Sequence, residues 1–254
     1  MLEINALAKN FGGLPALDGV SFSLAQGHIT ALIGPNGAGK TTLINTITGV
    51  LTPDRGEIIF DGQDLVGRKP HEIARRGISR TFQNLRLLPT HSVLDNVLCG
   101  LTVKATSSFA AAMLRLPGLR HRERLFRLQA LEMLDRFGLA GKAAWPLAAL
   151  SYGEKKKVEM ARAFVAEPRL VLLDEPVAGL NPAETAGIAV LLQQLRRAGH
   201  TMLLVEHDME LVMRISDQVV VLDSGRCIAR STPDEIRTNP LVLEAYLGKT
   251  GRAA

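Results

Sequence analysis

The stretch Gly34-Pro-Asn-Gly37-Ala-Gly39-Lys40-Thr41 decides the fold of this 254-residue chain. Its closely spaced glycines predict a tight turn whose backbone N–H groups converge on one small space. An apolar run, His28–Ile33, leads into the turn, and a run of helical character, Thr41–Thr48, follows it. A strand, a glycine turn and a helix in this order, with Lys-Thr at the junction, are typical of a phosphate-binding loop. The sequence therefore predicts an α/β fold built around a nucleotide site.

This loop suggests what its residues would do. The N-terminus of the helix that follows carries positive potential and favours anions. We expect Lys40 to reach the β- and γ-phosphates of ATP, and the Thr41 hydroxyl to help hold Mg²⁺. ATP is the expected ligand and Mg²⁺ the expected cofactor. The residues expected to bind ATP here are Gly34, Pro35, Asn36, Gly37, Ala38, Gly39, Lys40, Thr41 and Thr42.

A second motif, Leu170-Val-Leu-Leu-Asp174-Glu175-Pro176, is an apolar strand that ends in two carboxylates. Alone, it is equally typical of a buried strand followed by an acidic turn. Together with the phosphate loop it indicates a site at the C-terminal edge of a parallel sheet. We expect Asp174 to complete the Mg²⁺ shell, and Glu175 to polarise the water that attacks the γ-phosphate.

A third motif, Leu150-Ser151-Tyr152-Gly153-Glu154, opens a predicted helix. A serine followed three residues later by glutamate is an ordinary capping box. A helix N-terminus with a small residue in its first turn also suits an anion. The two interpretations are compatible, because a cap can position the helix that then binds phosphate.

Strands and helices alternate along the remaining sequence, which favours a parallel α/β core. Further strands are expected at Leu2–Leu7, Val20–Leu24, Glu57–Phe60, Thr201–Val205 and Val219–Leu222. Further helices are expected from Ser92, over Arg122–Phe137, from Ser151 to Glu167, from Asn181-Pro182 to Gly199, and from Thr232, before a frayed tail at Thr250–Ala254.

Composition excludes several classes of protein. No apolar run approaches the roughly 20 residues that span a bilayer, and no signal peptide is expected at the N-terminus. Two separated cysteines predict neither a disulfide nor a zinc site. The net charge of +5 falls entirely within residues 104–142. We interpret Arg120–Arg127 and Lys155–Lys157 as solvated helix faces; contact with lipid headgroups or with a loop of a membrane partner is the alternative.

From Leu2 to Gly248, the order and spacing of these motifs resemble the ATP-binding subunits of ABC transporters. The chain is most similar to the first ATPase of bacterial branched-chain (hydrophobic) amino acid importers. Local matches are Phe11-Gly-Gly, Arg80-Thr-Phe-Gln-Asn84, Ala178-Gly-Leu-Asn-Pro182, Val205-Glu-His-Asp-Met209 and Ala245-Tyr-Leu-Gly248.

The resemblance implies a P-loop NTPase core of the ABC ATPase type, with an antiparallel β subdomain and an inserted helical subdomain. The core would comprise residues 1–83 and 167–254, and the helical subdomain residues 84–166. Gln83 would contact Mg²⁺ and relay the nucleotide state. His207 would contact the γ-phosphate, and Phe11 would stack on adenine.

The signature residues Ser151, Tyr152, Gly153 and Glu154 would act across a dimer, on ATP held by a second ATPase subunit. The implied partners are that subunit, either a paralogue or a second copy, two membrane permease subunits, and indirectly a periplasmic substrate-binding protein. The implied location is peripheral, at the cytoplasmic face of the inner membrane. Four residues depart from the usual pattern: Tyr152 replaces glycine, Glu154 replaces glutamine, Asn181 replaces aspartate and Phe11 replaces the commoner tyrosine.

Other functions remain open at this point. An ATPase of a urea importer or of a lipopolysaccharide exporter would share every catalytic residue, and genomic neighbours would separate these cases. Non-transport nucleic-acid ATPases of this family commonly carry tandem ATPase units or a long coiled-coil insertion. The sequence has neither, so no nucleic acid is expected. A regulatory module without turnover is disfavoured by Glu175.

Overall fold

The computed structural model describes residues 1–104 and 117–247, and its strands form two sheets. The larger sheet has six strands in the order β10-β9-β3-β8-β7-β6. All neighbours in it are parallel except β9 and β10. Its strands are β3 (Ile29–Ile33), β6 (Ile78–Arg80), β7 (Leu170–Asp174), β8 (Thr201–Val205), β9 (Gln218–Asp223) and β10 (Arg226–Ser231). The predicted parallel core is confirmed, and β6 and β10 are strands that the sequence pattern did not predict.

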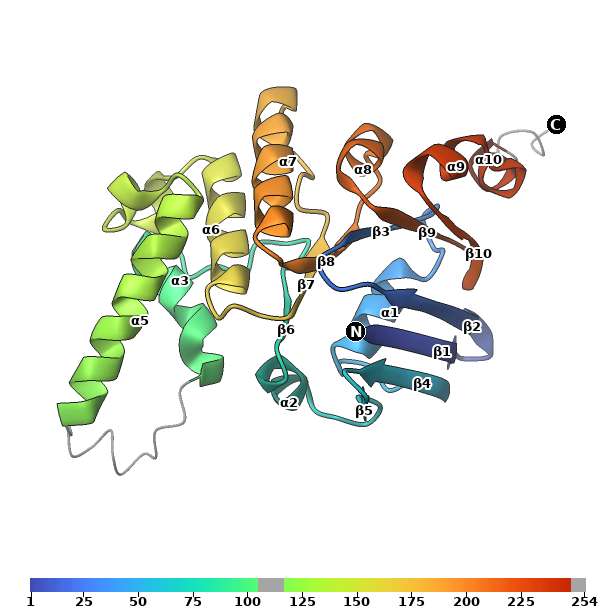
Figure 1. Ribbon diagram of the computed structural model, residues 1–254, viewed down its shortest axis with the longest axis horizontal. Helices are drawn as coiled ribbons and strands as arrows, with labels where there is room; N and C mark the ends of the chain where they lie inside the picture. Colours follow the sequence, from blue (N-terminus) through green and yellow to red (C-terminus); the bar gives the residue numbers. More distant parts are fainter. Residues whose placement is uncertain (105–116, 248–254) are drawn as a thin grey trace.

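The smaller sheet is antiparallel, with the order β2-β1-β4-β5. It comprises β1 (Leu2–Phe11), β2 (Leu14–Leu24), β4 (Arg55–Phe60) and β5 (Gln63–Asp64). This sheet confirms the expected antiparallel layer near the start of the chain, and it faces one side of the larger sheet (Figure 1).

Helices occupy the remaining sides of the larger sheet and one end of the molecule. They are α1 (Lys40–Ile47), α2 (Pro70–Arg75), α3 (Val93–Leu98), α5 (Pro117–Arg136), α6 (Tyr152–Phe164), α7 (Pro182–Arg197), α8 (Met209–Ile215), α9 (Pro233–Thr238) and α10 (Pro240–Leu247), with short 3-10 turns at Cys99–Lys104, Ala140–Lys142 and Leu147–Ala149. The predicted helices are confirmed, except that the single helix expected from Thr232 is divided into α9 and α10. The helices α2 and α8 were not predicted. The predicted tail, Thr250–Ala254, lies outside the described residues.

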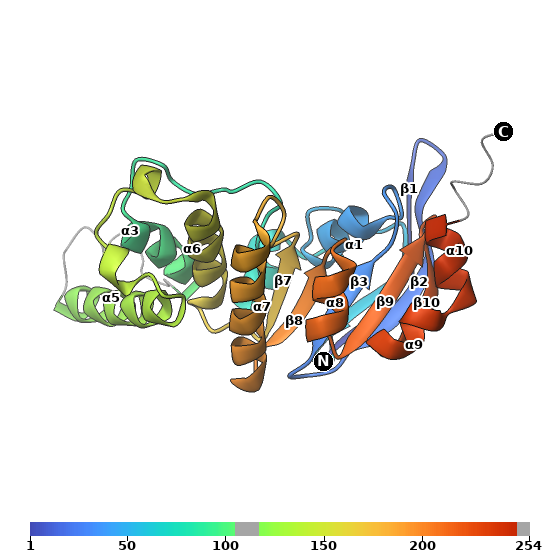
Figure 2. The same ribbon diagram turned by 90° about the horizontal axis from the view of Figure 1, so that it is seen from above.

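Alternation along the strands divides the core into layers, because successive side chains in a strand point to opposite faces. In β3, Leu32 packs toward α1 and the antiparallel sheet, whereas Ala31 and Ile33 pack toward α8, α9 and α10. In β9, Val220 and Leu222 pack on the same face of the sheet as Leu32. The larger sheet is therefore buried on both faces, with α1 on one side and α8 on the other (Figure 2).

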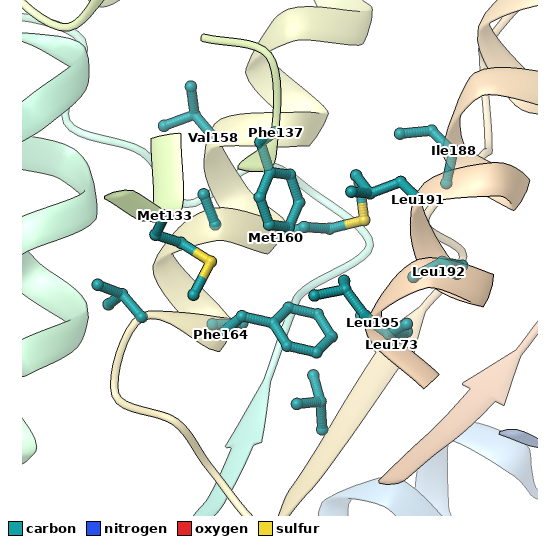
Figure 3. Packing of buried hydrophobic residues seen from close by; sticks show 14 of the residues in the cluster. Met133, Phe137, Val158, Met160, Phe164, Leu173, Ile188, Leu191, Leu192 and Leu195 are labelled. Carbon is teal, nitrogen blue, oxygen red and sulfur yellow. The ribbon is translucent and has the colours of Figure 1, made fainter. Parts of the chain in front are cut away.

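The helices α3, α5 and α6 form the end of the molecule away from the antiparallel sheet (Figure 1). Figure 3 shows residues of α5 and α6 packed against α7 and β7, with Phe164 of α6 among them. The Phe164 ring is fully buried and lies 6.2 Å from the Phe137 ring. Complete burial of such a side chain stabilises by about 1.5–3 kcal/mol. The ends predicted for a helical subdomain, residues 84 and 166, remain a prediction.

None of the helices in the described ranges combines the length and the apolar character that crossing a membrane requires.

Candidate functional site

The glycine loop follows the fully buried strand β3 and ends at α1. Gly34 and Gly39 have φ angles of +148° and +101°, which are rarely adopted by residues with a side chain. A Cβ atom on Gly34 would lie 2.0 Å from the carbonyl oxygen of Leu222, and one on Gly39 would lie 2.4 Å from that of Ala16. Close backbone approach on both sides therefore explains why glycine stands at these positions.

Lys40 is the first residue of α1, and its side chain returns over the loop. Nζ donates hydrogen bonds to the carbonyl oxygens of Gly34, at 2.6 Å, and Pro35, at 3.0 Å. Burial lowers the pKa of Lys40, and the negative charges of Glu175 and Asp174 partly oppose this shift. The ammonium group thus lies in the electric field of both predicted acidic residues. Thr41 and Thr42 follow it in the first turn of α1.

Asp174 ends β7 and is buried. Its Oδ2 accepts a hydrogen bond of 2.8 Å from the guanidinium of Arg80, which also donates to Oδ1 of Asn45 at 2.6 Å. The Asp174 N–H donates to the Thr81 hydroxyl at 3.1 Å. The sequence pattern did not predict Arg80 as a site residue. Its contacts join β6 to α1 and β7, which are far apart in the chain.

Glu175 comes next, in a left-handed conformation with φ of +49°. Its N–H donates to the carbonyl oxygen of Val205 in β8, at 3.0 Å. Its Oε2 accepts a 2.7 Å hydrogen bond from the Gln83 amide, and its Oε1 lies 3.8 Å from Nδ1 of His207. The structure thus brings together three predicted site residues from distant segments of the chain.

Behind these residues lies a buried carboxylate, Glu206, which was not predicted. It is 1% exposed and accepts hydrogen bonds from the N–H groups of Val177, at 3.1 Å, and His207, at 3.2 Å. Burial raises the pKa of Glu206. It therefore joins the loop after Glu175 to the segment that carries His207.

Lys156, in the second turn of α6, is also buried, at 1% exposure. Its Nζ donates to the carbonyl oxygen of Glu175 at 3.1 Å and lies 3.5 Å from that of Gln83. The interpretation of Lys155–Lys157 as a solvated face is wrong for this residue. Helical spacing could have corrected it, because Lys156 shares the buried face of α6 with Met160 and Phe164.

The predicted signature, Ser151–Glu154, lies at the N-terminus of α6 and forms the expected capping box. The Glu154 N–H donates to the Ser151 hydroxyl at 3.2 Å, and the Ser151 N–H donates to Oε2 of Glu154 at 3.0 Å. Oε1 of Glu154 pairs with Lys142. The hydrogen bond from Lys142 is the main reason that the pKa of Glu154 is lowered.

A cavity of about 340 Å³ separates the start of α6 from the start of α7. Asn181 lines it and caps α7, where its Oδ1 accepts a 2.9 Å hydrogen bond from the Glu184 N–H. Gly153 also lines it, and a Cβ atom there would lie 2.5 Å from Oε1 of Glu184. The Tyr152 ring lies beside Gly179 and is 46% exposed.

In the described part of the chain, no hydrogen bond or ion pair joins Ser151–Glu154 to Gly34–Thr42. Phe11 stands apart from both. It is half-exposed at the end of β1, and the Lys9 ammonium lies 5.8 Å from its ring centre. The second strand of the same hairpin, β2, passes the phosphate loop at Ala16.

Side chains suited to Mg²⁺ are present, although no group of three or more His, Cys, Asp or Glu in the described ranges could hold a metal ion by itself. A Mg²⁺ ion that binds to nucleotide phosphates needs only one or two carboxylates from the protein. Asp174 provides a carboxylate, and Thr41 and Gln83 provide further oxygen atoms. This donor set fits a phosphate-bound Mg²⁺.

Comparisons with known proteins agree with this geometry. The family model described as "ABC transporter" matches residues 17–178, and that described as "Branched-chain amino acid ATP-binding cassette transporter" matches residues 226–251. The high-affinity branched-chain amino acid transport ATP-binding protein BraF of Pseudomonas aeruginosa is 41% identical over 250 residues, which cover 98% of each chain.

Two solved structures show the same fold. One is the ADP conformation of an ATP-binding cassette of an ABC transporter, with a TM-score of 0.85, 33% identity and coverage of 98% of each chain. The other is a dimeric post-hydrolysis state of an ATP-binding cassette bound to ADP and Pi. Its TM-score is 0.77 at 26% identity, with coverage of 92% of this chain and 99% of that one.

A glycine loop at the end of a central parallel strand, with a carboxylate pair two strands away, defines a nucleotide-binding ATPase. The chain belongs to the ABC transporter family, of which it is an ATP-hydrolysing member.

Proposed function

We propose that this ATPase powers an importer of branched-chain amino acids. The observation that carries the catalytic part is the hydrogen bond of Gln83 to Glu175, with His207 3.8 Å from the same carboxylate. The substrate part is supported by the 41% identical relative, whose name specifies branched-chain amino acid transport, and by the family match at residues 226–251.

In this proposal, ATP binds with its phosphates against the N-terminus of α1. The N–H groups of the loop 34–39 and of Thr41 and Thr42 donate to phosphate oxygens, and Lys40 turns from its own loop carbonyls to the β- and γ-phosphates. The half-exposed ring of Phe11 stacks on adenine.

Thr41, Gln83 and Asp174 would hold Mg²⁺. When bound, the ion neutralises phosphate charge and offsets the charge that develops during transfer. The guanidinium of Arg80 donates a hydrogen bond to Oδ2 of Asp174 and so fixes the orientation of that carboxylate. The Arg80 side chain is only 11% exposed, which keeps this pairing largely out of water.

Hydrolysis then depends on Glu175. Its carboxylate accepts a proton from a water molecule as the oxygen of that water attacks the γ-phosphorus, and the bond to the bridging oxygen of ADP breaks. Gln83 orients the carboxylate through Oε2, and His207 donates a hydrogen bond to the γ-phosphate. Glu206 holds the backbone at His207, so that the imidazole remains near Glu175.

A second ATPase subunit, either a paralogue or another copy, would supply the signature. Within the described residues, Ser151 and Gly153 form no hydrogen bond with the phosphate loop of their own chain, so they are available to the ATP of a neighbour. The dimeric cassette among the similar structures supports this arrangement.

A cavity of about 1020 Å³ lies beside the segment that follows Gln83. Ile73, Phe82 and Val103 give it apolar walls, and Arg75 and Arg86 are among the arginines that line it. Because Phe82 adjoins Gln83, an occupant of this cavity would be linked to Glu175. We propose that a cytoplasmic segment of a permease, with apolar and acidic side chains, binds here.

Two permease subunits and, indirectly, a periplasmic substrate-binding protein would complete the importer, with the ATPase at the cytoplasmic face of the inner membrane. The test is uptake of labelled leucine, isoleucine and valine by native cells that lack the gene. Wild-type chain should restore uptake, and Glu175→Gln should not. Restored uptake of urea, or restored lipopolysaccharide export, with amino acid uptake unchanged, would refute the substrate assignment.

Partners are tested separately, by purification of the tagged Glu175→Gln chain with ATP from native membranes. Mass spectrometry should identify a second ATPase and two permeases, with the wild-type chain without ATP as the control. Recovery of ribosomal or DNA-repair proteins instead would contradict the importer.

A further inference from the structure

We infer that Lys156 is a positioning residue that ties the signature end of α6 to the backbone of Glu175 and Gln83. This inference rests on the proposed roles of Glu175, Gln83 and the signature. It concerns a residue whose hydrogen bonds go to the backbone of Glu175 and Gln83 and not to their side chains.

The burial of Lys156 calls for a physical reason. A lysine is almost never fully buried unless it is paired, because removing its charge from water is costly. Within the residues that the structure describes, Lys156 forms no ion pair within 4 Å. Its hydrogen bonds go instead to the carbonyl oxygens of Glu175 and Gln83. The ammonium group of Lys156 therefore holds two backbone carbonyl groups of the site in place.

The bond to Glu175 matters because of the backbone conformation there. Glu175 is a non-glycine residue with φ of +49°, which persists only when neighbouring structure holds it. The N–H of Glu175 is held by Val205, and its carbonyl oxygen by Lys156. The peptide groups on both sides of the catalytic residue are therefore fixed, one by β8 and the other by α6.

The same lysine lies one helical turn after the signature. Tyr152 and Gly153 open α6, and Lys156 follows within its second turn. The Lys156 Nζ also lies 5.9 Å from the centre of the Tyr152 ring. A helix is stiff over this length, so a shift of Gln83 or Glu175 with nucleotide state would move the signature through Lys156. One subunit could thereby couple its own ATP site to the ATP site that it completes in its neighbour.

The experiment uses the full chain with Lys156→Met, which keeps an apolar stem of similar length and removes the donor. Lys156→Gln keeps an N–H donor on a shorter side chain. Lys155→Met is the matched control, because Lys155 is half-exposed on the same helix and its hydrogen bond to Ser151 comes from the backbone N–H, which methionine keeps. Each variant is assayed for thermal unfolding, for the Kd of MgATP, and for kcat and KM of ATP hydrolysis.

The expected result is a fall in kcat of at least about tenfold for Lys156→Met, with the Kd of MgATP within about twofold of wild type. Lys156→Gln should recover part of the lost kcat, whereas Lys155→Met should match wild type. If Lys156 had only a structural role, Lys156→Met would lower the unfolding temperature. It would not lower kcat while leaving the Kd of MgATP unchanged.

The inference is overturned if kcat of Lys156→Met stays within about twofold of wild type, or if Kd rises as much as kcat falls. If Lys156→Met does not fold, Lys156→Gln takes its place in the test. Its kcat and its Kd of MgATP, each relative to wild type, are then compared in the same way. Wild-type chain that binds ATP without hydrolysing it would refute the proposed function itself, and the inference with it. A normal wild-type kcat shared by both Lys156 variants would refute the inference alone.

Discussion

The amide nitrogen of Gln83 donates a 2.7 Å hydrogen bond to Oε2 of Glu175, across 92 positions of sequence. This contact links the segment beside the larger cavity to the carboxylate that is expected to activate water. The other oxygen of this carboxylate, Oε1, lies 3.8 Å from Nδ1 of His207.

Glu175→Gln should abolish turnover while ATP binding persists. Glutamine has the same shape but cannot accept the proton of water, and a positioned general base contributes about 10²–10⁴-fold to rate. We therefore expect kcat to fall at least about 100-fold, with the Kd of MgATP within about twofold. Steady-state hydrolysis and equilibrium nucleotide binding measure the two quantities. Hydrolysis within tenfold of wild type would mean that another group activates the water.

Glu206→Gln should change the pH dependence of stability. Burial raises the pKa of Glu206 in the folded state, so its protonation stabilises the wild-type fold at acidic pH, and this contribution is lost as pH rises through the raised pKa. The glutamine variant does not titrate. Its Tm relative to wild type should therefore be higher at about pH 8 than at about pH 5.5.

Thermal unfolding of both proteins at the two pH values gives this comparison, with the exposed Glu210→Gln as the control. A Tm difference that is constant with pH would show that the Glu206 carboxyl does not titrate in this range.

Asn181→Ala should destabilise α7 by about 1 kcal/mol, because the side chain that caps its Glu184 N–H is lost. Asn181→Asp keeps the capping oxygen and restores the residue more usual in this family, so its free energy of unfolding should stay within about 0.5 kcal/mol of wild type. Urea denaturation measures both variants. Equal losses in the two would mean that the amide group, rather than the capping oxygen, matters.

The pair Lys142–Glu154 should contribute little to stability. Its side chains are 35% and 25% exposed, and ion pairs with such access to water are worth about 0.2–1 kcal/mol. A double-mutant cycle with Glu154→Gln and Lys142→Met should give a coupling in this range, and salt should reduce it. Glutamine still accepts the Ser151 N–H, so the cap survives. A coupling above 2 kcal/mol, or one insensitive to salt, would contradict this expectation.

Features that depend on residues close together in the chain could be predicted from the sequence, whereas features that depend on distant contacts could not. Local patterns were enough for the phosphate loop, because its geometry depends on backbone conformation and on glycines that are adjacent in the chain. The same holds for the capping boxes at Ser92 and Ser151, whose partners lie three residues away. Strands buried on both faces, such as Leu170–Asp174, were predicted from continuous apolar character alone.

Short elements such as β6 and α8 were missed, because they hold too few residues to display a period. The strand β6 exists as a strand because it pairs with β7, more than 80 positions further along the chain. The roles of Gln83 and His207 came from family resemblance, since nothing local to either residue indicates a catalytic site.

The sequence by itself determined that a nucleotide loop, an acidic strand end and a capped helix occur in one α/β chain. Only the tertiary structure decided which polar residues serve the site. No local pattern marks Arg80, Lys156 or Glu206 as a site residue, yet each is buried or nearly so. Arg80 and Lys156 bond to Asp174 and Glu175 from other elements, and Glu206 accepts a hydrogen bond from the N–H of Val177, 29 positions away. The reason is that burial makes a charged group depend on specific partners. Those partners lie far away in the chain and are brought near only when the sheet and helices pack.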